Sequence, residues 1–200
     1  MRQGILFVNH KPTILMNHSQ DVYDVRGESI PEEKALLCYF VSEGKKNIIK
    51  LVLYEYVRQF NGRPLFNLGF GDLDQKTGKL SDEKMSDNED HYRVFNTVLA
   101  TIPRLLSEYR DGVVMVRGSD STPQFMEDCK KVCVRKCVDH LCKKAHRRIR
   151  IYRNFLDKHY ELLNQEFAFH GTEGIEEDSP TEPYKKDKSY KGIIIEKRLN

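Results

Sequence analysis

The sequence predicts an α+β fold, a mainly antiparallel sheet with helices packed on one face and a helical insertion. Residues 35–74 are rich in β-branched and aromatic side chains and are interrupted by turn-forming residues, as in consecutive strands. Residues 91–110, and the chain after Pro123, have the apolar spacing of helices, with a short apolar run between them. The resulting element order, β-β-β-α-β-α-β-β, is typical of helices gathered on one face of a sheet.

Three strands are expected in the first half of the chain. The segment "ALLCYFVSEG" ends in a turn, and "NIIKLVLYEYV" continues towards the turn dipeptide Asn61-Gly62. The third strand is "PLFNLGFGDLD", in which Gly69 and Gly71 indicate a bulge or a close backbone approach. The polar residues 75–90 then predict a loop or a short hairpin.

The second half alternates helices and strands. The segment "HYRVFNTVLATIPRLLSEYR" forms one apolar helix face, with Asp90 as its cap and Pro103 as a kink or a break. "VVMVRGS" predicts a buried strand that ends in a glycine turn, and Pro123 favours a new helix start. The absence of Gly and Pro from Gln124 to His170 allows helix over most of that span. "FAFHG" and "YKGIIIEKR" predict the last two strands.

The length of 200 residues suits one domain with a substantial hydrophobic core. We expect residues 36–200 to form this domain and residues 1–35 to be an N-terminal extension, with one strand at "ILFV". A helical insertion rich in Cys, Lys and Arg is expected at about residues 122–146.

Composition argues against several classes of protein. No stretch approaches the roughly 18 apolar residues that cross a membrane, so we expect no membrane partner. The N-terminus lacks the small-residue cleavage site of a signal peptide. The five cysteines are odd in number and clustered, unlike a secreted disulfide framework, which favours a reducing cytoplasm. The formal net charge of +3 is too small to imply a nucleic-acid partner by itself.

The charge is nevertheless distributed unevenly. Between Cys129 and Lys158 there are eleven basic residues and two acidic ones. Such a segment is either a solvated helix face or an anion-binding surface, and RNA or DNA is the natural polyanion, because phosphate contact needs only clustered cations. No RNA-recognition, helix-turn-helix or zinc-finger signature accompanies the segment. The nucleic-acid-binding candidates are Lys130, Lys131, Arg135, Lys136, Lys143, Lys144 and Arg147.

Four of the five cysteines lie in "CKKVCVRKCVDHLC". On a continuous helix, Cys129, Cys133, Cys137 and His140 would share one face, and Cys142 would lie on the opposite side. Zinc accepts such ligands, but structural zinc sites usually join paired Cys-x₂₋₄-Cys knuckles from separate elements. Buried cysteine also behaves as a small hydrophobe. A core stripe is therefore favoured over a metal site or a redox device, and no metal site is predicted.

Several short motifs occur in a fixed order, namely "CYFVSEG", "NLGFGDLD", "VLATI", "RGSDS", "RRIRIYR" and "SYKGIIIEKR". In these motifs the chain resembles a family of small, functionally uncharacterised bacterial proteins, a domain-of-unknown-function family, over roughly Leu37 to Arg198. The family shares N-L-x-F-G-D, Gly-Ser turn and R-x-R-x-Y motifs. The resemblance implies a fold but no known activity. Here about two dozen residues separate the Gly-Ser turn from R-x-R-x-Y, whereas only a few separate them in the family.

The helix that begins at "RRIRIYR" places Arg148 in the middle of its apolar face. An inward arginine is seldom unpaired, because its burial alone costs several kcal/mol. Arg148 is expected either to pair with Asp72 or Asp74, or to line a pocket with the Gly-Ser turn, whose amides and hydroxyls suit a phosphate. The predicted anion-binding residues are Gly118, Ser119, Ser121, Arg148 and Arg150.

This pocket carries a geometric condition. A straight helix of about 24 residues would span about 36 Å and would keep Arg148 away from Ser119. The insertion must therefore fold back between about Val134 and His146.

The sequence does not decide whether the protein is an enzyme. The catalytic candidates are Asp72, Asp74, Asp120, Tyr152 and His159. Asp72 and Asp74 would point to one face of a strand, and Mg²⁺ is the cofactor they would hold if the protein were a nuclease. A turn-forming strand end is favoured for this pair, and a core histidine is favoured for His159.

Three hypotheses for function remain. The favoured one is a cytoplasmic bacterial nucleic-acid- or phosphate-binding protein, such as an RNase-type toxin or a phage-defence effector. The second is a non-enzymatic protein-interaction module, such as an antitoxin, a regulator or a complex subunit, with a protein partner on the insertion. The absence of a nucleophile elbow, a Walker loop or an HExxH motif favours this second hypothesis. The third is a nucleotide-binding sensor. We also expect an oligomer, of an order that the sequence does not define.

Overall fold

The computed structural model of the protein describes residues 21–74, 77, 79–81, 88–132, 137, 142–174 and 179–198. Within this described part, nine strands form one sheet. The strands are β1 (Arg26–Ile30), β2 (Ala35–Ser42), β3 (Ile48–Phe60), β4 (Arg63–Asp74), β5 (Lys79–Ser81), β6 (Val113–Arg117), β7 (Phe167–Thr172), β8 (Thr181–Pro183) and β9 (Gly192–Lys197). The described helices are α1 (His91–Glu108), α2 (Pro123–Val132) and α3 (Arg147–Leu163), with the short 3₁₀ turns η1 (Pro31–Glu33) and η2 (Ser119–Ser121).

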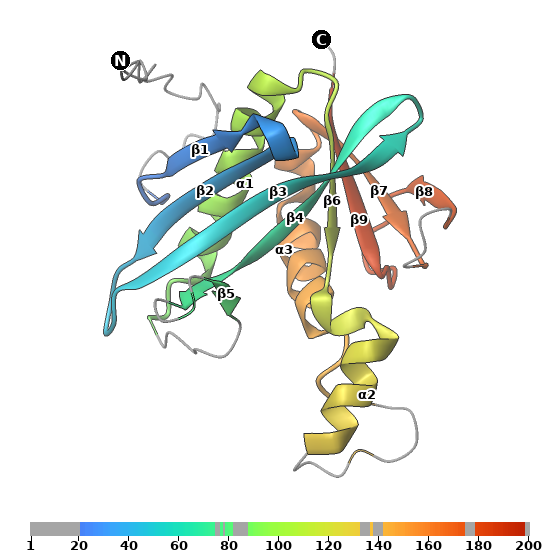
Figure 1. The fold of residues 1–200 in the computed structure, drawn as a ribbon. Helices are drawn as coiled ribbons and strands as arrows, with labels where there is room; N and C mark the ends of the chain where they lie inside the picture. The colour runs from blue at the N-terminus through green and yellow to red at the C-terminus, as the bar shows by residue number, and fades with distance from the viewer. Residues whose placement is uncertain are drawn as a thin grey trace, which may run out of the picture.

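The predicted α+β fold with a mainly antiparallel sheet is confirmed. The strand order is β1-β2-β3-β4-β6-β9-β7-β8, and β5 pairs with β4 beside this path. The described pairings are antiparallel except that of β4 with β6, which the chain joins through α1. Because β4 and β6 are parallel, the turn that follows β6 lies at the same edge of the sheet as the end of β4 (Figure 1).

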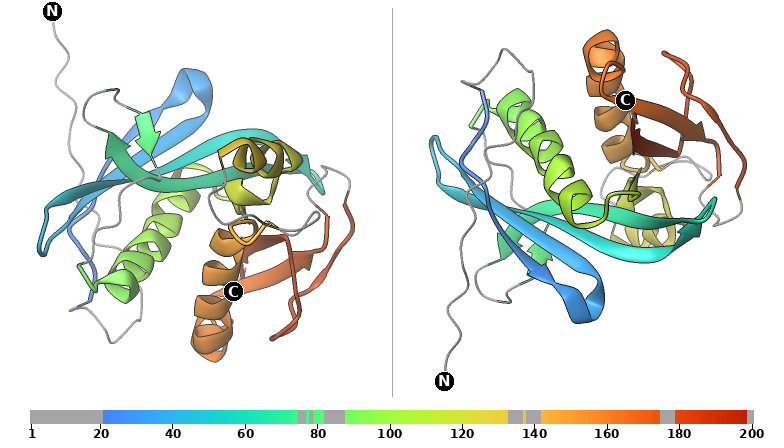
Figure 2. Two further views of the ribbon diagram at one scale, coloured as in Figure 1. Left: turned by 90° about the horizontal axis from the view of Figure 1, so that it is seen from below. Right: turned by 90° about the horizontal axis from the view of Figure 1, so that it is seen from above.

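Helices α1 and α3 lie side by side on one side of the curved sheet, α1 against the half with β1 to β4 and α3 against the half with β6, β9 and β7 (Figure 2). They meet through an aromatic contact, with the ring centroids of Phe95 and Phe155 5.6 Å apart. The helix residues buried in the core are Val94, Val98, Ile102, Leu105, Leu106, Ile149, Phe155, Leu156 and Leu163. Helix α2 instead projects away from this body (Figure 1).

Three expectations about local structure differ in part from the structure. The register shift lies in β3 between Tyr56 and Arg58, whereas Gly69 and Gly71 of β4 pair regularly with β3. The expected break at Pro103 is absent, since α1 continues through it to Glu108. The helix expected after Pro123 is divided into α2, which ends at Val132, and α3, which begins at Arg147. None of the helices in the described residues is long and apolar enough to cross a membrane.

Residues 21–35, the described part of the segment predicted as an N-terminal extension, contribute to the sheet and the core. Strand β1 pairs with β2 along its whole length. Tyr23 is buried in the core, and its backbone N–H donates to Thr97 Oγ1 of α1 at 2.9 Å. The expected strand "ILFV" lies outside the described residues.

A polar cluster is buried where the sheet meets the start of α1. Lys50 Nζ lies 2.6 Å from Asp72 Oδ1, and the two residues are opposite each other on β3 and β4. Ser42 and Tyr23 donate to Asp90 Oδ2 over 2.6 and 2.8 Å, just before α1 begins. Burial alone would raise the pKa of Asp90, but these hydrogen bonds and the nearby charge of Lys50 outweigh it and lower the pKa. The cluster therefore favours the charged form of the Asp90 carboxyl group.

Replacing Lys50 with Met leaves the Asp72 carboxylate buried without its cation. We expect the free energy of unfolding, measured by urea denaturation, to fall by about 3–5 kcal/mol. Lys131→Met is the matched control, because the 2.8 Å pair of Lys131 with Asp128 is exposed on one helix face, where water screens it and its loss changes stability little. Equal losses for the two variants would contradict the structural role of the buried pair.

The lowered pKa of Asp90 predicts a pH dependence. In the unfolded chain an aspartate titrates at about 3.9, and in the folded protein Asp90 titrates below this. The stability that Asp90 contributes is therefore present above about pH 4 and is lost as the pH falls through its folded-state pKa. We expect Asp90→Asn to flatten the decline of stability over this acidic range. Unfolding curves measured at several pH values, compared with those of the exposed Asp111→Asn, test this.

Candidate functional site

The turn after β6 and the first residues of α3 meet in space. The side-chain Oδ2 of Asp120, in η2, accepts the backbone N–H groups of Arg147 and Arg148 at 2.8 and 3.0 Å. Its backbone carbonyl accepts the N–H of His146 at 3.1 Å. Asp120 is only 5% exposed. Its carboxylate thus occupies amide donors that a helix start otherwise leaves without partners.

The side chain of Arg148 makes a further contact across this junction. Its Nη1 donates to Ser119 Oγ. The condition that the insertion must fold back is therefore met, and the structure brings Gly118, Ser119, Ser121 and Arg148 together. The expected pair of Arg148 with Asp72 is wrong, because Asp72 pairs with Lys50 in the buried cluster.

Gly118 permits the close approach of these segments. A Cβ atom at this position would lie 2.5 Å from Asp120 Oδ1 and 3.1 Å from the backbone nitrogen of Ile149. Since real Cβ contacts under 3.0 Å essentially never occur, a side chain here would push η2 away from α3. Gly118 is thus a packing requirement of the junction.

The junction differs electrostatically from a phosphate cradle. A phosphate that approached the first amides of α3 would meet the Asp120 carboxylate already bound to them. Asp120 Oδ1 and Ser121 Oγ are buried, and neither has a hydrogen-bond partner among the described atoms. The group with the geometry to contact an anion is therefore the Arg148 guanidinium beside the Ser119 hydroxyl, rather than the amides and Ser121 predicted from the sequence.

The three aspartates among the catalytic candidates have separate surroundings, whereas Tyr152 and His159 contact the same aromatic pair, Phe95 and Phe155. Asp72 is in the Lys50 pair, Asp74 accepts a hydrogen bond from Thr77 at 2.9 Å, and Asp120 caps α3. Tyr152 packs edge-on to Phe95, with ring centroids 5.5 Å apart, and His159 lies 4.5 Å from the Phe155 ring. Among the described residues, no group of three or more His, Cys, Asp and Glu side chains is arranged to hold a metal ion. Only Asp72 and Asp74 were predicted as ligands for the Mg²⁺ of a nuclease. In the structure the Asp72 carboxylate is already paired with Lys50 Nζ.

A small cavity of about 40 Å³ lies between α1, α3 and the sheet. Its walls include Phe95 and Leu99 of α1, Tyr152 and Phe155 of α3, and Ile193 of β9. A water molecule needs roughly 10–15 Å³ of such space and also polar partners. Because the walls are apolar, this cavity is a gap in packing between the two helices.

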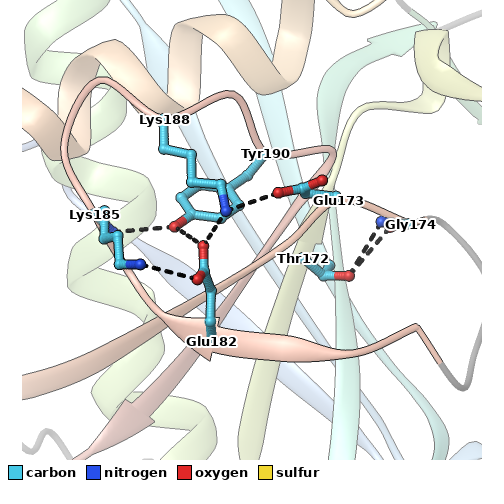
Figure 3. A network of polar contacts seen from close by, with 7 residues as sticks. All are labelled: Thr172, Glu173, Gly174, Glu182, Lys185, Lys188 and Tyr190. Atoms are coloured by element: carbon cyan, nitrogen blue, oxygen red, sulfur yellow. Dashed lines mark hydrogen bonds and ion pairs between the residues drawn. The ribbon is translucent and has the colours of Figure 1, made fainter.

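A second polar network lies far from the junction in sequence, around the loop that joins β8 and β9 (Figure 3). Hydrogen bonds from Lys188, Tyr190 and Lys185 lower the pKa of Glu182 to about 2. Tyr190 is buried and covers Gly171, where a Cβ would lie 2.3 Å from the ring. The network therefore fastens the loop to β7 and β8, and its lysines are balanced by carboxylates.

The basic candidates occupy α2, the turn before α3 and the first turns of α3. Lys130, Lys131, Lys143 and Arg147 are exposed, as is Arg150, whereas Lys144 is partly buried. Arg135 and Lys136 lie outside the described residues.

The cysteine pattern expected for a continuous helix is wrong in one respect. Cys142 does not lie opposite Cys129, because the chain folds back and brings the two Sγ atoms to 3.5 Å. The Sγ of Cys137 accepts the N–H of Lys143 at 3.4 Å. Cys133 and His140 lie outside the described residues. A single helical wheel missed this contact, since it assumes an uninterrupted helix.

The fold and the junction define a class of protein, a small α+β domain in which a basic helical unit projects from the sheet after the end of strand β6. Residues 19–126 match the model of DUF6934, a family of unknown function, so the chain belongs to this family. The match begins well before Leu37, where the resemblance to a family of uncharacterised proteins starts, and it ends within α2. No curated protein and no solved structure matches the chain.

The capping role of Asp120 gives a prediction for stability. Asp120→Ala removes the acceptor of two backbone N–H groups, and we expect the free energy of unfolding to fall by about 1–2 kcal/mol. Asp120→Asn keeps an acceptor oxygen in place and should lose less. Asp111→Ala, at an exposed position outside the junction, is the control in the same urea titration. If Asp120→Ala were as stable as this control, the cap would not hold η2 to α3.

Proposed function

We propose that the protein binds the phosphate backbone of a nucleic acid through a basic surface made by α2, the turn before α3 and the first turns of α3. The observation that carries this proposal is the projection of α2 from the domain, together with the fold-back that returns the chain to η2 (Figure 1). A projecting, positively charged unit reaches an extended polyanion without obstruction from the sheet.

Lys131 of this surface pairs with Asp128, whereas four other cations form no ion pair that the structure describes. Lys130, Lys143, Arg147 and Arg150 form no salt bridge with any acidic side chain that the structure describes. Some lysines elsewhere are paired, as in the Figure 3 network and in the 2.8 Å contact of Lys186 with Glu161. Unpaired, solvated cations are the groups from which a nucleic acid can release counterions.

The position of the arginines on α3 also favours a ligand. The start of a helix carries a partial positive charge, which disfavours cations and favours anions. Helix α3 has no acidic residue in its first turn, and it begins with Arg147, Arg148 and Arg150. The buried Asp120 carboxylate, which accepts the N–H of Arg147, offsets part of the positive charge at the start of α3. The exposed arginines therefore weaken the helix start, and a bound polyanion would relieve their repulsion.

A second candidate is a protein-interaction surface on α2, because Val132 at the end of this helix is 75% exposed. An RNase-type toxin or a phage-defence effector stays a prediction, and strand cleavage in the binding assay is its test.

Reversing four of the exposed charges tests the proposal. We expect the variant with Glu at positions Lys130, Lys143, Arg147 and Arg150 to lose most of its affinity for labelled single-stranded RNA at low salt. Four lost phosphate contacts would reduce the slope of log K against log salt by about 3, since each contact to a single strand contributes roughly 0.7. Fluorescence anisotropy over a salt series measures both quantities.

The matched control places Glu at Lys45, Lys46, Lys191 and Lys197, which are exposed residues outside the basic surface. It changes the net charge by the same amount and should keep most of the wild-type salt slope. Equal losses in the two variants would mean that only net charge matters. Absence of RNA and DNA binding by the wild-type protein at low salt would reject the proposal and favour the protein-interaction surface.

A further inference from the structure

Helix α2 and the chain from Cys142 to Arg147 form a unit that projects from the domain, here called the projecting unit. The contact between Cys129 and Cys142 joins its two parts, which lie outside the apolar core. Cys129 is the one buried residue of α2, at 7% exposure, and Cys142 lies in the chain that returns towards α3. Their Sγ atoms are 3.5 Å apart, and both carry thiols. A disulfide needs an S–S length of about 2.05 Å, so a small shift of the side chains would bring the sulfurs to bonding distance.

We propose that Cys129 and Cys142 form a redox-active dithiol site, which a small-molecule disulfide such as oxidised glutathione converts to an intramolecular disulfide. This site goes beyond nucleic-acid binding and does not depend on it.

The two sulfurs have different access, and this sets the order of the steps. Cys142 is partly exposed, whereas Cys129 is buried. The Cys142 thiolate attacks the small-molecule disulfide, forms a mixed disulfide and releases one glutathione thiolate, which takes up a proton. Cys129, after losing its own proton, attacks the Cys142 sulfur and expels the second glutathione. The protein loses two electrons and two protons, and one molecule of oxidised glutathione becomes two of the reduced form.

The surroundings favour this reaction at Cys142 over reaction at Cys38. Cys142 is partly exposed, so a small-molecule disulfide can reach its sulfur. Cys38 is fully buried in β2, and burial raises the pKa of its thiol to about 11. Cys38 therefore stays protonated near neutral pH and serves as an internal control.

The disulfide would have a structural consequence. It would join α2 covalently to the turn that leads to Arg147, so the projecting unit would become a closed loop. A closed loop is restrained even when its helix frays, because the cross-link removes conformations from the open ensemble.

The experiment uses the full-length protein, reduced and then treated with oxidised glutathione. Peptide mapping by mass spectrometry should find Cys129 joined to Cys142, with a mass loss of two hydrogen atoms, and Cys38 unmodified. Limited proteolysis of the projecting unit should slow on oxidation and recover on reduction.

The order of steps is tested in a background with the substitutions Cys133→Ser and Cys137→Ser. There, adding Cys129→Ser should trap a glutathione adduct on Cys142, and adding Cys142→Ser should leave Cys129 without one.

Circular dichroism on each variant establishes that it is folded, and the wild-type mapping does not depend on any substitution. Glutathione adducts on Cys142 without the Cys129 cross-link in the wild-type protein would overturn the proposal. So would a disulfide that joins either residue to a different cysteine in preference. Stoichiometric zinc in the purified protein, with Cys129 and Cys142 protected from alkylation until a chelator removes the metal, would also overturn it, because the sulfurs would then be ligands.

Discussion

The carboxylate of Asp120 is the interaction on which the attachment of α2 and the returning chain to the domain depends. It accepts two backbone N–H groups at the start of α3, and its residue also accepts the N–H of His146 through the backbone. Without this junction, η2 and α3 would be joined only by a chain segment of some two dozen residues. Gly118 is part of the same constraint, since any side chain there would collide with the carboxylate. A short acidic turn thus fixes where the long insertion begins and ends.

Much of the fold could be predicted because its pattern is local. The alternation along β2 and β3 and the apolar face of α1 belong to single elements, so propensity and periodicity identify them. Strand β1, "RGESI", escaped detection because it has almost no apolar residues and is stabilised by pairing with β2. The pairing of β4 with β6 is likewise a tertiary feature, and no local pattern in either strand indicates it.

The site was predicted in part, for a similar reason. The Gly-Ser turn and Arg148 were paired through their residue types, and the structure brings them together. The role of Asp120 was missed because capping depends on a helix start that is distant in sequence. The partner of Asp72 is not evident from the sequence, because Lys50 lies in an apolar run that indicates a strand but not an ion pair across two strands. The contact of Cys129 with Cys142 requires the fold-back itself, which periodicity cannot represent.

The projecting unit is held by polar and sulfur contacts rather than by a core, and this has a consequence for its charges. Helix α2 buries only Cys129, so packing contributes little to its position. Among the contacts that the structure describes, the Asp120 cap, the Arg148–Ser119 hydrogen bond and the thiol contact connect its lysines to the arginines of α3. Each of these interactions is directional, so it depends on the exact placement of the two groups that it joins. The position of these basic residues relative to one another therefore depends on a few directional contacts near Ser119 and Asp120.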